Sequence, residues 1–333
     1  MDALSTAERL FAEGHIHDAI SALEADIEVN ETPEKLARLM QMRHSGFFRL
    51  PQCAVSTPWP PTSADSNLPL GTIPEISASG LNAAQLVNGI FNHGALIVRN
   101  LFDSNSTREL IECIDTSMQV YDNLAGDPKT NEWFTPLQPC PENGEVRIAR
   151  KWVREGGGVL AADSPKSMFK LIRMLKKQQL LSVIADYLGE HPILSVKKTT
   201  LRRVTPDRNG GWHQDGAFLG QGIRTLNLWV ALTDCGVDAP SMDMVPARMK
   251  RILPTGQAGA DFSWSVGGGF VEEGDVDFAP VRLTFSAGDA IFFDETNLHR
   301  TAVDPSMTHS RHAIEAWFFA PSSYPLGQIP IVC

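Results

Sequence analysis

The segment GGWHQDGAFLG at residues 210–220 places His213 two residues before Asp215, among glycines and aromatic side chains. An imidazole and a carboxylate are both side chains that bind transition metals. A histidine and an aspartate at this spacing are also common by chance in a chain with nine histidines. The pair therefore predicts a metal site only if the chain offers a third ligand and a suitable scaffold.

A third candidate ligand, His299, ends the segment AGDAIFFDETNLH at residues 287–299, just after an apolar run that predicts a strand. Two imidazoles and one carboxylate form the facial triad of non-haem iron oxygenases, which leaves coordination positions open. Neutral imidazoles and one carboxylate hold Fe(II) while preserving its positive charge, and the open positions accept a bidentate oxo-acid and O2. His213, Asp215 and His299 are thus the predicted metal ligands.

Arg311 opens the next predicted strand, RHAIEAWFF at residues 311–319, where alternation points one set of side chains into the interior. A forked and permanently charged guanidinium suits the far carboxylate of 2-oxoglutarate. His309 and His312 are expected near the surface and not as ligands, because a shift of one residue turns a side chain to the other face of a sheet.

The elements that must position these residues change in character along the chain. The first half is mainly helical in pattern, whereas short runs rich in β-forming residues, separated by turn signals, appear from residue 193 onward. The runs are ILSVKKTTLRRV, TLNLWVAL, GGFVEE, VRLTFSA, DAIFFD and HAIEAWFFA. This order predicts an α+β protein with an antiparallel barrel or sandwich braced by helices, and a barrel mouth can hold a ligand.

Residues 1–50 have apolar positions at helical spacing, with Thr32 as the expected N-cap of a helix that starts at Pro33. The pattern is similar to a short tetratricopeptide (TPR)-like extension. A single helical hairpin cannot bury its apolar face alone, so we expect it to pack on the main domain or on a second subunit, and a homodimer is one prediction. Residues 51–80 are rich in Pro and Ser and predict a linker without regular structure.

The composition excludes several classes of protein. The 333-residue chain carries a net charge of −10, which argues against a nucleic-acid surface. It has no apolar run long enough to cross a membrane and no signal-peptide pattern at its start. Its five cysteines are scattered without a C-x-x-C motif, which favours free thiols and a cytoplasmic location. The expected partner is a small-molecule substrate.

Several motifs, taken in order, make the chain resemble the phytanoyl-CoA dioxygenase family of Fe(II)/2-oxoglutarate-dependent oxygenases. The matching segments are FNHGALIVRNLF, WHQD, LNLWVALTDC, PSMDMVPARMK, AGDAIFFDETNLH and SRHAIEAWFF. They cover roughly residues 80–322. The resemblance implies a double-stranded β-helix (jelly-roll, cupin-like) core in residues 81–333, buttressed by helices. The segment VPARMK lacks the glycine, serine and histidine that the family often has there, which leaves the loop on the substrate side open.

The same resemblance assigns roles to individual residues. It implies that iron binds His213, Asp215 and His299, and that Arg311 and Thr301 bind a carboxylate of the cosubstrate 2-oxoglutarate. It places Lys198 and Trp229 on strands that contribute to the cosubstrate pocket, with Lys197 as the alternative to Lys198. No catalytic side chain beyond the metal ligands is implied.

The implied activity is the oxidation, by O2 and 2-oxoglutarate, of an unactivated C–H bond in a small molecule, with release of succinate and CO2. Asp215 favours hydroxylation over halogenation, since related halogenases have a small residue in its place. Loops at 124–166 and 253–275 are expected to shape the substrate pocket. Two alternatives stay open: a non-enzymatic β-barrel binding module with a TPR-like adaptor, and a metal-dependent cupin-type enzyme that does not use 2-oxoglutarate.

Overall fold

The computed structural model describes residues 3–51, 58–63, 67–123, 131–208, 210–272 and 276–333. Its centre is a large sheet in the strand order β1-β2-β8-β5-β10-β4-β11, with β3 paired to β4. The strands are β1 (Glu75–Ser77), β2 (Ala95–Arg99), β3 (Gly158–Leu160), β4 (Ile193–Val204), β5 (Thr225–Ala231), β8 (Ala290–Phe293), β10 (Arg311–Phe319) and β11 (Pro330–Val332). A smaller sheet has the order β7-β6-β9 and consists of β7 (Val281–Leu283), β6 (Ser241–Met244) and β9 (His299–Ala302).

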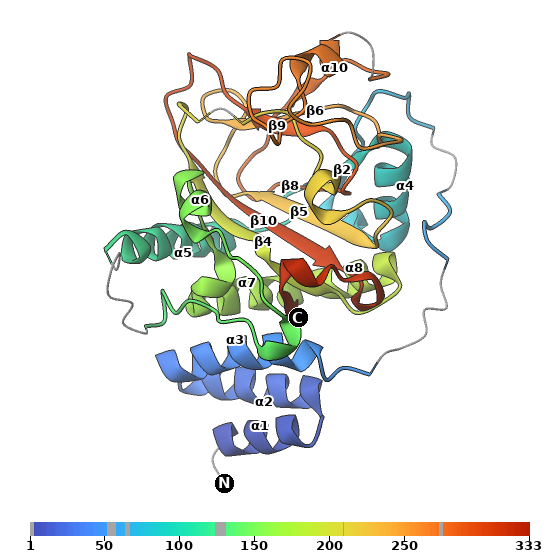
Figure 1. Ribbon diagram of the computed structural model, residues 1–333. Coiled ribbons are helices and arrows are strands. Elements are labelled where there is room, and N and C mark those ends of the chain that lie inside the picture. Colours follow the sequence, from blue (N-terminus) through green and yellow to red (C-terminus); the bar gives the residue numbers. More distant parts are fainter. Residues whose placement is uncertain (1–2, 52–57, 64–66, 124–130, 209, 273–275) are drawn as a thin grey trace.

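The helices of the first half of the chain lie beside and below the large sheet, whereas the small sheet lies above it (Figure 1). They are α1 (Ala3–Ala12), α2 (Ile16–Val29), α3 (Pro33–Phe47), α4 (Ala83–His93), α5 (Ser104–Asn123), α6 (Arg150–Glu155), α7 (Pro165–Lys177) and α8 (Leu180–Leu188). The short helices α9 (Gly216–Leu219) and α10 (Gly268–Glu272) lie in the connections of the strand-rich half. The chain is thus a mixed protein of sheets and helices, in agreement with the α+β prediction.

The alternation along β10 separates a helix-facing side from a site-facing side. His312 points toward the helices, and its Nε2 lies 3.0 Å from Asp115 Oδ1 on α5. Arg311 and Glu315 point the other way, and Arg311 Nη1 donates to the Ser241 carbonyl oxygen of the small sheet at 3.0 Å. Since Glu315 pairs with Trp229 on β5, those two side chains share the face of Arg311. The space between the two sheets is therefore where the predicted site residues gather.

The N-terminal helices pack on the rest of the chain through α3, which contacts both α7 and β11. Figure 1 shows α1, α2 and α3 stacked below this contact. Thr32 Oγ1 accepts a hydrogen bond from the Lys35 backbone N–H and Pro33 occupies the first turn, as predicted. The main body thus covers the apolar face of α3, so the reason for expecting a second subunit there is gone.

Two details of the secondary-structure prediction were wrong. Residues 75–77, predicted as linker, form β1 beside β2, where Glu75 makes an ion pair with Arg99 at 2.7 Å. The segment GGFVEE, predicted as a strand, contributes the short helix α10. Its glycines explain the difference, because the Gly269 N–H donates to the Ala258 carbonyl and the backbone turns there instead of pairing in a sheet.

Cysteines and membrane segments complete the comparison with the sequence. Cys113, Cys140, Cys235 and Cys333 are free, as expected, whereas Cys53 lies outside the described residues. Among the described residues, none of the helices has the length and apolar character needed to cross a bilayer.

Candidate metal centre

The predicted ligands His213 and His299 lie opposite each other on adjacent strand segments. Each backbone N–H donates to the other residue's carbonyl, at 2.9 and 3.0 Å, and this pairing puts both imidazoles on one side with ring centroids 4.3 Å apart. Gln214 points the other way and bonds to the carbonyls of Thr296 and Arg251. The H-Q-D spacing therefore directs His213 and Asp215 to the same side while the residue between them anchors the loop.

Potential metal-binding atoms of His213, Asp215 and His299 all lie within 4.8 Å of one another. His213 Nδ1 lies 3.0 Å from the Gly211 carbonyl oxygen, and His299 Nδ1 lies 3.2 Å from that of Asn297. An Nδ1–H that donates to a carbonyl leaves the Nε2 lone pair free for a metal. The two rings thus have the hydrogen-bonding arrangement common among metal-bound histidines.

The buried carboxylate of Asp215 is only partly satisfied. Its Oδ1 accepts from Lys198 Nζ at 2.5 Å, whereas Oδ2 has no hydrogen-bond partner in the described part of the chain. An oxygen atom buried without a partner is costly unless a ligand satisfies it. His299 Nε2 lies 3.8 Å from the same Oδ2. The residues present therefore fit a divalent metal ion at this point.

The protonation states suit the same role. Burial and the nearby His213 together lower the pKa of His299 to about 3. Burial also lowers the pKa of His213. For Asp215, burial favours the neutral form, but Lys198 and the two histidines outweigh it and lower the pKa of the carboxyl. At neutral pH the site thus holds two neutral imidazoles and one carboxylate, which is the set that binds a metal without losing protons first.

Arg311 lies between the two sheets, with 2% of its surface exposed. Its guanidinium carbon is 5.2 Å from the centroid of the Trp229 ring. Among the described residues no carboxylate pairs with it, and its Nε has no partner. Burial lowers the pKa of Arg311 to about 10, so it stays charged at neutral pH. A buried cation without an anion is unfavourable and indicates a site for an anionic ligand.

The other predicted cosubstrate residues are also placed by the strands. Lys198 and not Lys197 faces the site, as its contact with Asp215 shows. Thr301 follows His299 by two residues on β9 and so shares its face. Gly210 packs closely against Thr301, because a Cβ at position 210 would lie 3.1 Å from the Thr301 Cβ. The segment before His213 therefore lies directly beside Thr301.

One charged residue between the sheets was missed by the sequence analysis. Glu315 accepts from Trp317 Nε1 at 3.1 Å and lies 3.6 Å from Arg202 Nε. It contributes, after Asp215, to keeping Lys198 protonated, and this raises the pKa of Lys198 against the effect of burial. Strand alternation could have predicted its position, because Glu315 lies four residues after Arg311 in the same strand and therefore on the same face.

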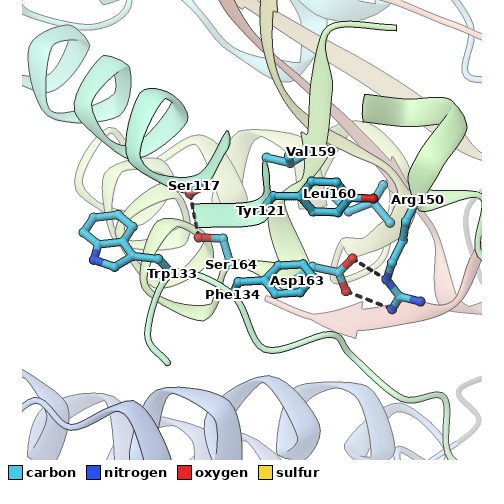
Figure 2. A pocket seen from close by; sticks show the side chains of 9 residues that line it. All are labelled: Ser117, Tyr121, Trp133, Phe134, Arg150, Val159, Leu160, Asp163 and Ser164. Atoms are coloured by element: carbon cyan, nitrogen blue, oxygen red, sulfur yellow. Dashed lines mark hydrogen bonds and ion pairs between the residues drawn. The ribbon is translucent and has the colours of Figure 1, made fainter. Parts of the chain in front are cut away.

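A separate small hollow lies under the loop that follows α5 (Figure 2). It holds about 10 Å³, enough for roughly one water molecule. Arg150 Nε lies 2.6 Å from Asp163 Oδ2 at its wall, and the Tyr121 and Phe134 rings close it. Arg150 is therefore already paired with Asp163, and none of the residues that line this hollow is a metal ligand.

Comparison with known families covers all of the candidate site residues. The family model described as "Phytanoyl-CoA dioxygenase (PhyH)" matches residues 92–313, about two thirds of the chain. The chain belongs to the phytanoyl-CoA dioxygenase family. As a member of that family it is an oxidoreductase of the Fe(II)- and 2-oxoglutarate-dependent class. The matched range includes His213, Asp215, His299 and Arg311, so the geometry above falls within the family's domain.

Solved structures with a similar arrangement include enzymes of the same class at low sequence identity. The epimerase SnoN, solved with Fe3+, alpha ketoglutarate and nogalamycin RO, is 17% identical with a TM-score of 0.48, over 74% of this chain and 85% of that one. The carbocyclase SnoK from nogalamycin biosynthesis is 15% identical with a TM-score of 0.48, over 74% and 87%. EctD from S. alaskensis, solved with 2-oxoglutarate and 5-hydroxyectoine, is 16% identical with a TM-score of 0.49, over 81% of both chains. No curated protein matches the chain.

Proposed function

We propose that this protein hydroxylates an unactivated C–H bond of a small molecule, converting 2-oxoglutarate and O2 to succinate and CO2 as it does so. The observation that carries the proposal is a pair of features between the two sheets. One is a His–Asp–His set whose carboxylate has an oxygen without a hydrogen-bond partner, and the other is a buried arginine that meets no anion, both within the part of the chain that the structure describes. The first fits a metal and the second fits a carboxylate of the cosubstrate.

In this proposal His213, Asp215 and His299 hold the iron. Bound Fe(II) would supply the redox chemistry with O2, and the ligand set leaves positions open for the cosubstrate and oxygen. The protein's own residues bind the metal and the cosubstrate and orient them relative to each other. The backbone pairing of His213 with His299 fixes the two rings relative to each other, and Asp215 retains the carboxylate that favours hydroxylation over halogenation.

Arg311 would bind the far carboxylate of 2-oxoglutarate through its forked guanidinium. Trp229 stacks beside it and keeps water from that side, and Thr301 offers a hydroxyl on the face that also carries His299. Lys198 reaches the site from β4 and holds the carboxylate of Asp215 through its Nζ. Because the guanidinium has no carboxylate partner among the described residues, the incoming carboxylate displaces no existing ion pair.

We further propose that the two sheets form a double-stranded β-helix within residues 81–333, that residues 1–50 are a TPR-like extension, and that 51–80 link them, apart from β1, which adds to the edge of the large sheet. The links between the sheets support the first point. Phe293 of β8 lies against His299 of β9 with ring centroids 4.8 Å apart, and Arg311 of β10 bonds to β6. The alternative of a cupin-type enzyme without 2-oxoglutarate leaves the unpaired Arg311 unexplained.

Replacing either histidine tests the metal site. We expect His213→Ala and His299→Ala to lose at least tenfold in Fe(II) affinity, measured by metal analysis after equilibrium dialysis. We also expect them to lose the visible absorption band that forms when 2-oxoglutarate is added to the iron-loaded protein without oxygen. His309→Ala is the matched control, because His309 is exposed and pairs with Asp238.

Iron binding and the absorption band retained in both variants would contradict the proposed ligands. A folded wild-type protein that neither binds iron nor gains thermal stability from 2-oxoglutarate would instead favour a non-enzymatic binding module. Melting curves of all variants separate loss of the site from loss of the fold.

A further inference from the structure

Three aromatic side chains form a cluster near the metal ligands, which we call the aromatic cluster: Phe218, Phe262 and Trp264. The rings of Phe262 and Trp264 are stacked with centroids 5.0 Å apart and planes inclined by 5°. Phe218 lies 6.4 Å from Trp264 at an inclination of 54°. Phe218 and Phe262 are each 44% exposed, although large apolar side chains gathered in one place are normally covered.

The aromatic cluster borders the metal ligands on two sides. The Trp264 ring stands edge-on to His213, with centroids 5.7 Å apart. Lys198 Nζ, which contacts Asp215, lies 5.2 Å from the centroid of the Phe218 ring. A molecule resting on these rings would therefore lie next to the space that faces the metal.

The loop that carries two of these rings is fixed to the metal-ligand segment. The Val266 N–H donates to the Trp212 carbonyl at 2.7 Å, one residue before His213. Ser265 is fully buried, and its Oγ bonds to the backbone of Phe262 at 3.0 and 3.1 Å. At Gly211 a Cβ would lie 2.6 Å from the Ser265 Cβ, so only glycine allows this approach. The exposed rings are thus held in place before any ligand arrives.

We propose that the aromatic cluster binds a flat apolar ring of the substrate and brings the neighbouring C–H bond to the metal. The inference rests on the proposed function and adds the chemical class of the substrate to it. Aromatic faces attract other aromatic rings in offset-stacked or edge-to-face arrangements, beyond the effect of apolar burial alone. Two ring orientations, those of the stacked pair and of Phe218, suit a planar group better than a flexible chain, because a planar group loses less conformational freedom on binding.

Two probes of matched size and charge test the planar preference: naphthalene-2-carboxylate and its saturated form, decahydronaphthalene-2-carboxylate. Binding to the full-length, iron-free protein is measured by titration calorimetry, so turnover plays no part. We expect the planar probe to bind at least tenfold more tightly. Phe262→Leu and Trp264→Leu keep an apolar side chain but remove the flat ring, and each is expected to weaken the planar probe about tenfold or more.

Trp152→Leu is the control, since Trp152 is 59% exposed on α6 and belongs to no part of the site. Equal binding of the two probes, or planar binding that the Phe262 and Trp264 variants leave unchanged, would overturn the aromatic cluster as a substrate site. Iron affinity measured on the same samples keeps the two proposals apart. Planar binding with no iron affinity would refute the proposed function alone, whereas iron affinity without planar preference would refute only this inference.

Discussion

Two arginines of this chain are almost completely buried and differ in one respect. Arg43 Nη2 lies 2.5 Å from Glu24 Oε1, and its Nη1 donates to the Val332 carbonyl at 2.6 Å. Arg311 bonds to one carbonyl, and no carboxylate within the described ranges pairs with it. A buried charge with a partner can serve the fold alone. A buried charge without a partner lowers the stability of the protein and indicates a functional role.

This difference predicts opposite effects of the same substitution. Arg311→Met is expected to raise the free energy of unfolding of the ligand-free protein by about 1–3 kcal/mol, since it removes an uncompensated buried charge. Arg43→Met is expected to lower it by about 1–3 kcal/mol, because the buried Val332 carbonyl loses its donor. Glu24 then keeps only Lys176 as an ion-pair partner among the described residues. Urea denaturation of both variants measures the two changes.

Binding of the cosubstrate should have the opposite effect, because it should stabilise the wild type more than Arg311→Met. Adding saturating 2-oxoglutarate to the metal-loaded proteins should stabilise the wild type further and metal-loaded Arg311→Met much less, since the metal ligands are intact in both. A loss of stability in ligand-free Arg311→Met similar to that of Arg43→Met would show that Arg311 has a structural partner after all.

At the scale of elements, the segment after β8 buries two neighbouring acidic residues, Asp294 and Glu295. Asp294 is paired with Arg248 at 2.6 Å, whereas Glu295 accepts only the Gly222 N–H through its side chain among the described contacts. Burial and the neighbouring Asp294 raise the pKa of Glu295 to about 7. Glu295 also accepts the Gly216 N–H with its carbonyl, so this segment supports the loop that carries Asp215.

The raised pKa of Glu295 fixes the sign of a pH dependence. The folded state binds the proton more tightly than the unfolded state, whose value is near 4.5. The stabilising contribution is therefore complete below pH 4.5 and is lost as the pH rises through about 7. Relative to Glu295→Gln, which keeps the acceptor, the wild type should lose about 3 kcal/mol between pH 4.5 and 8. Parallel stability curves in urea for the two proteins would disprove this.

Most of the strands could be predicted from local alternation, and the grouping of His213, Asp215 and His299 could be predicted from the order of the motifs along the chain. Alternation in RHAIEAWFF is enough to place Arg311 and His312 on opposite faces of the sheet, as the structure has them, but His312 lies against α5 and not at the surface as predicted. The contact of Lys198 with Asp215 could not be predicted, since it depends on how β4 and residues 213–215 are placed relative to each other in the folded protein. The aromatic cluster could not be predicted from the sequence either, because it depends on the contact between Gly211 and Ser265, which lie in two distant segments of the chain.

At the scale of the whole molecule, His44 joins three distant parts of the chain. Its Nδ1 lies 2.9 Å from the Pro330 carbonyl oxygen, and its Nε2 accepts from the Cys140 N–H at 2.9 Å. Only the neutral ring with the proton on Nδ1 satisfies both contacts. Burial lowers the pKa of His44, in keeping with that state.

Acid should therefore weaken this junction first. Because the folded-state pKa of His44 lies below its ordinary value of 6.5, its contribution to stability is present above pH 6.5 and is lost as the pH falls. Buried histidines elsewhere act in the same direction, so the comparison with His44→Gln isolates this one. We expect the stability difference between wild type and variant to shrink below pH 6.5 in thermal melts. A difference independent of pH would contradict the assignment of the neutral ring.

The contact between α3 and β11 also has a consequence for how the protein is made. Arg43 and the carbonyl of Val332 that it binds are 289 positions apart. At about 5–20 residues per second, a ribosome needs roughly 15–60 s to travel that distance. During this time α3 can pack on α7, which is made much earlier, but not on β11. The contact between α3 and β11 therefore forms only after the intervening residues are made, and until then α7 holds α3 on the main body.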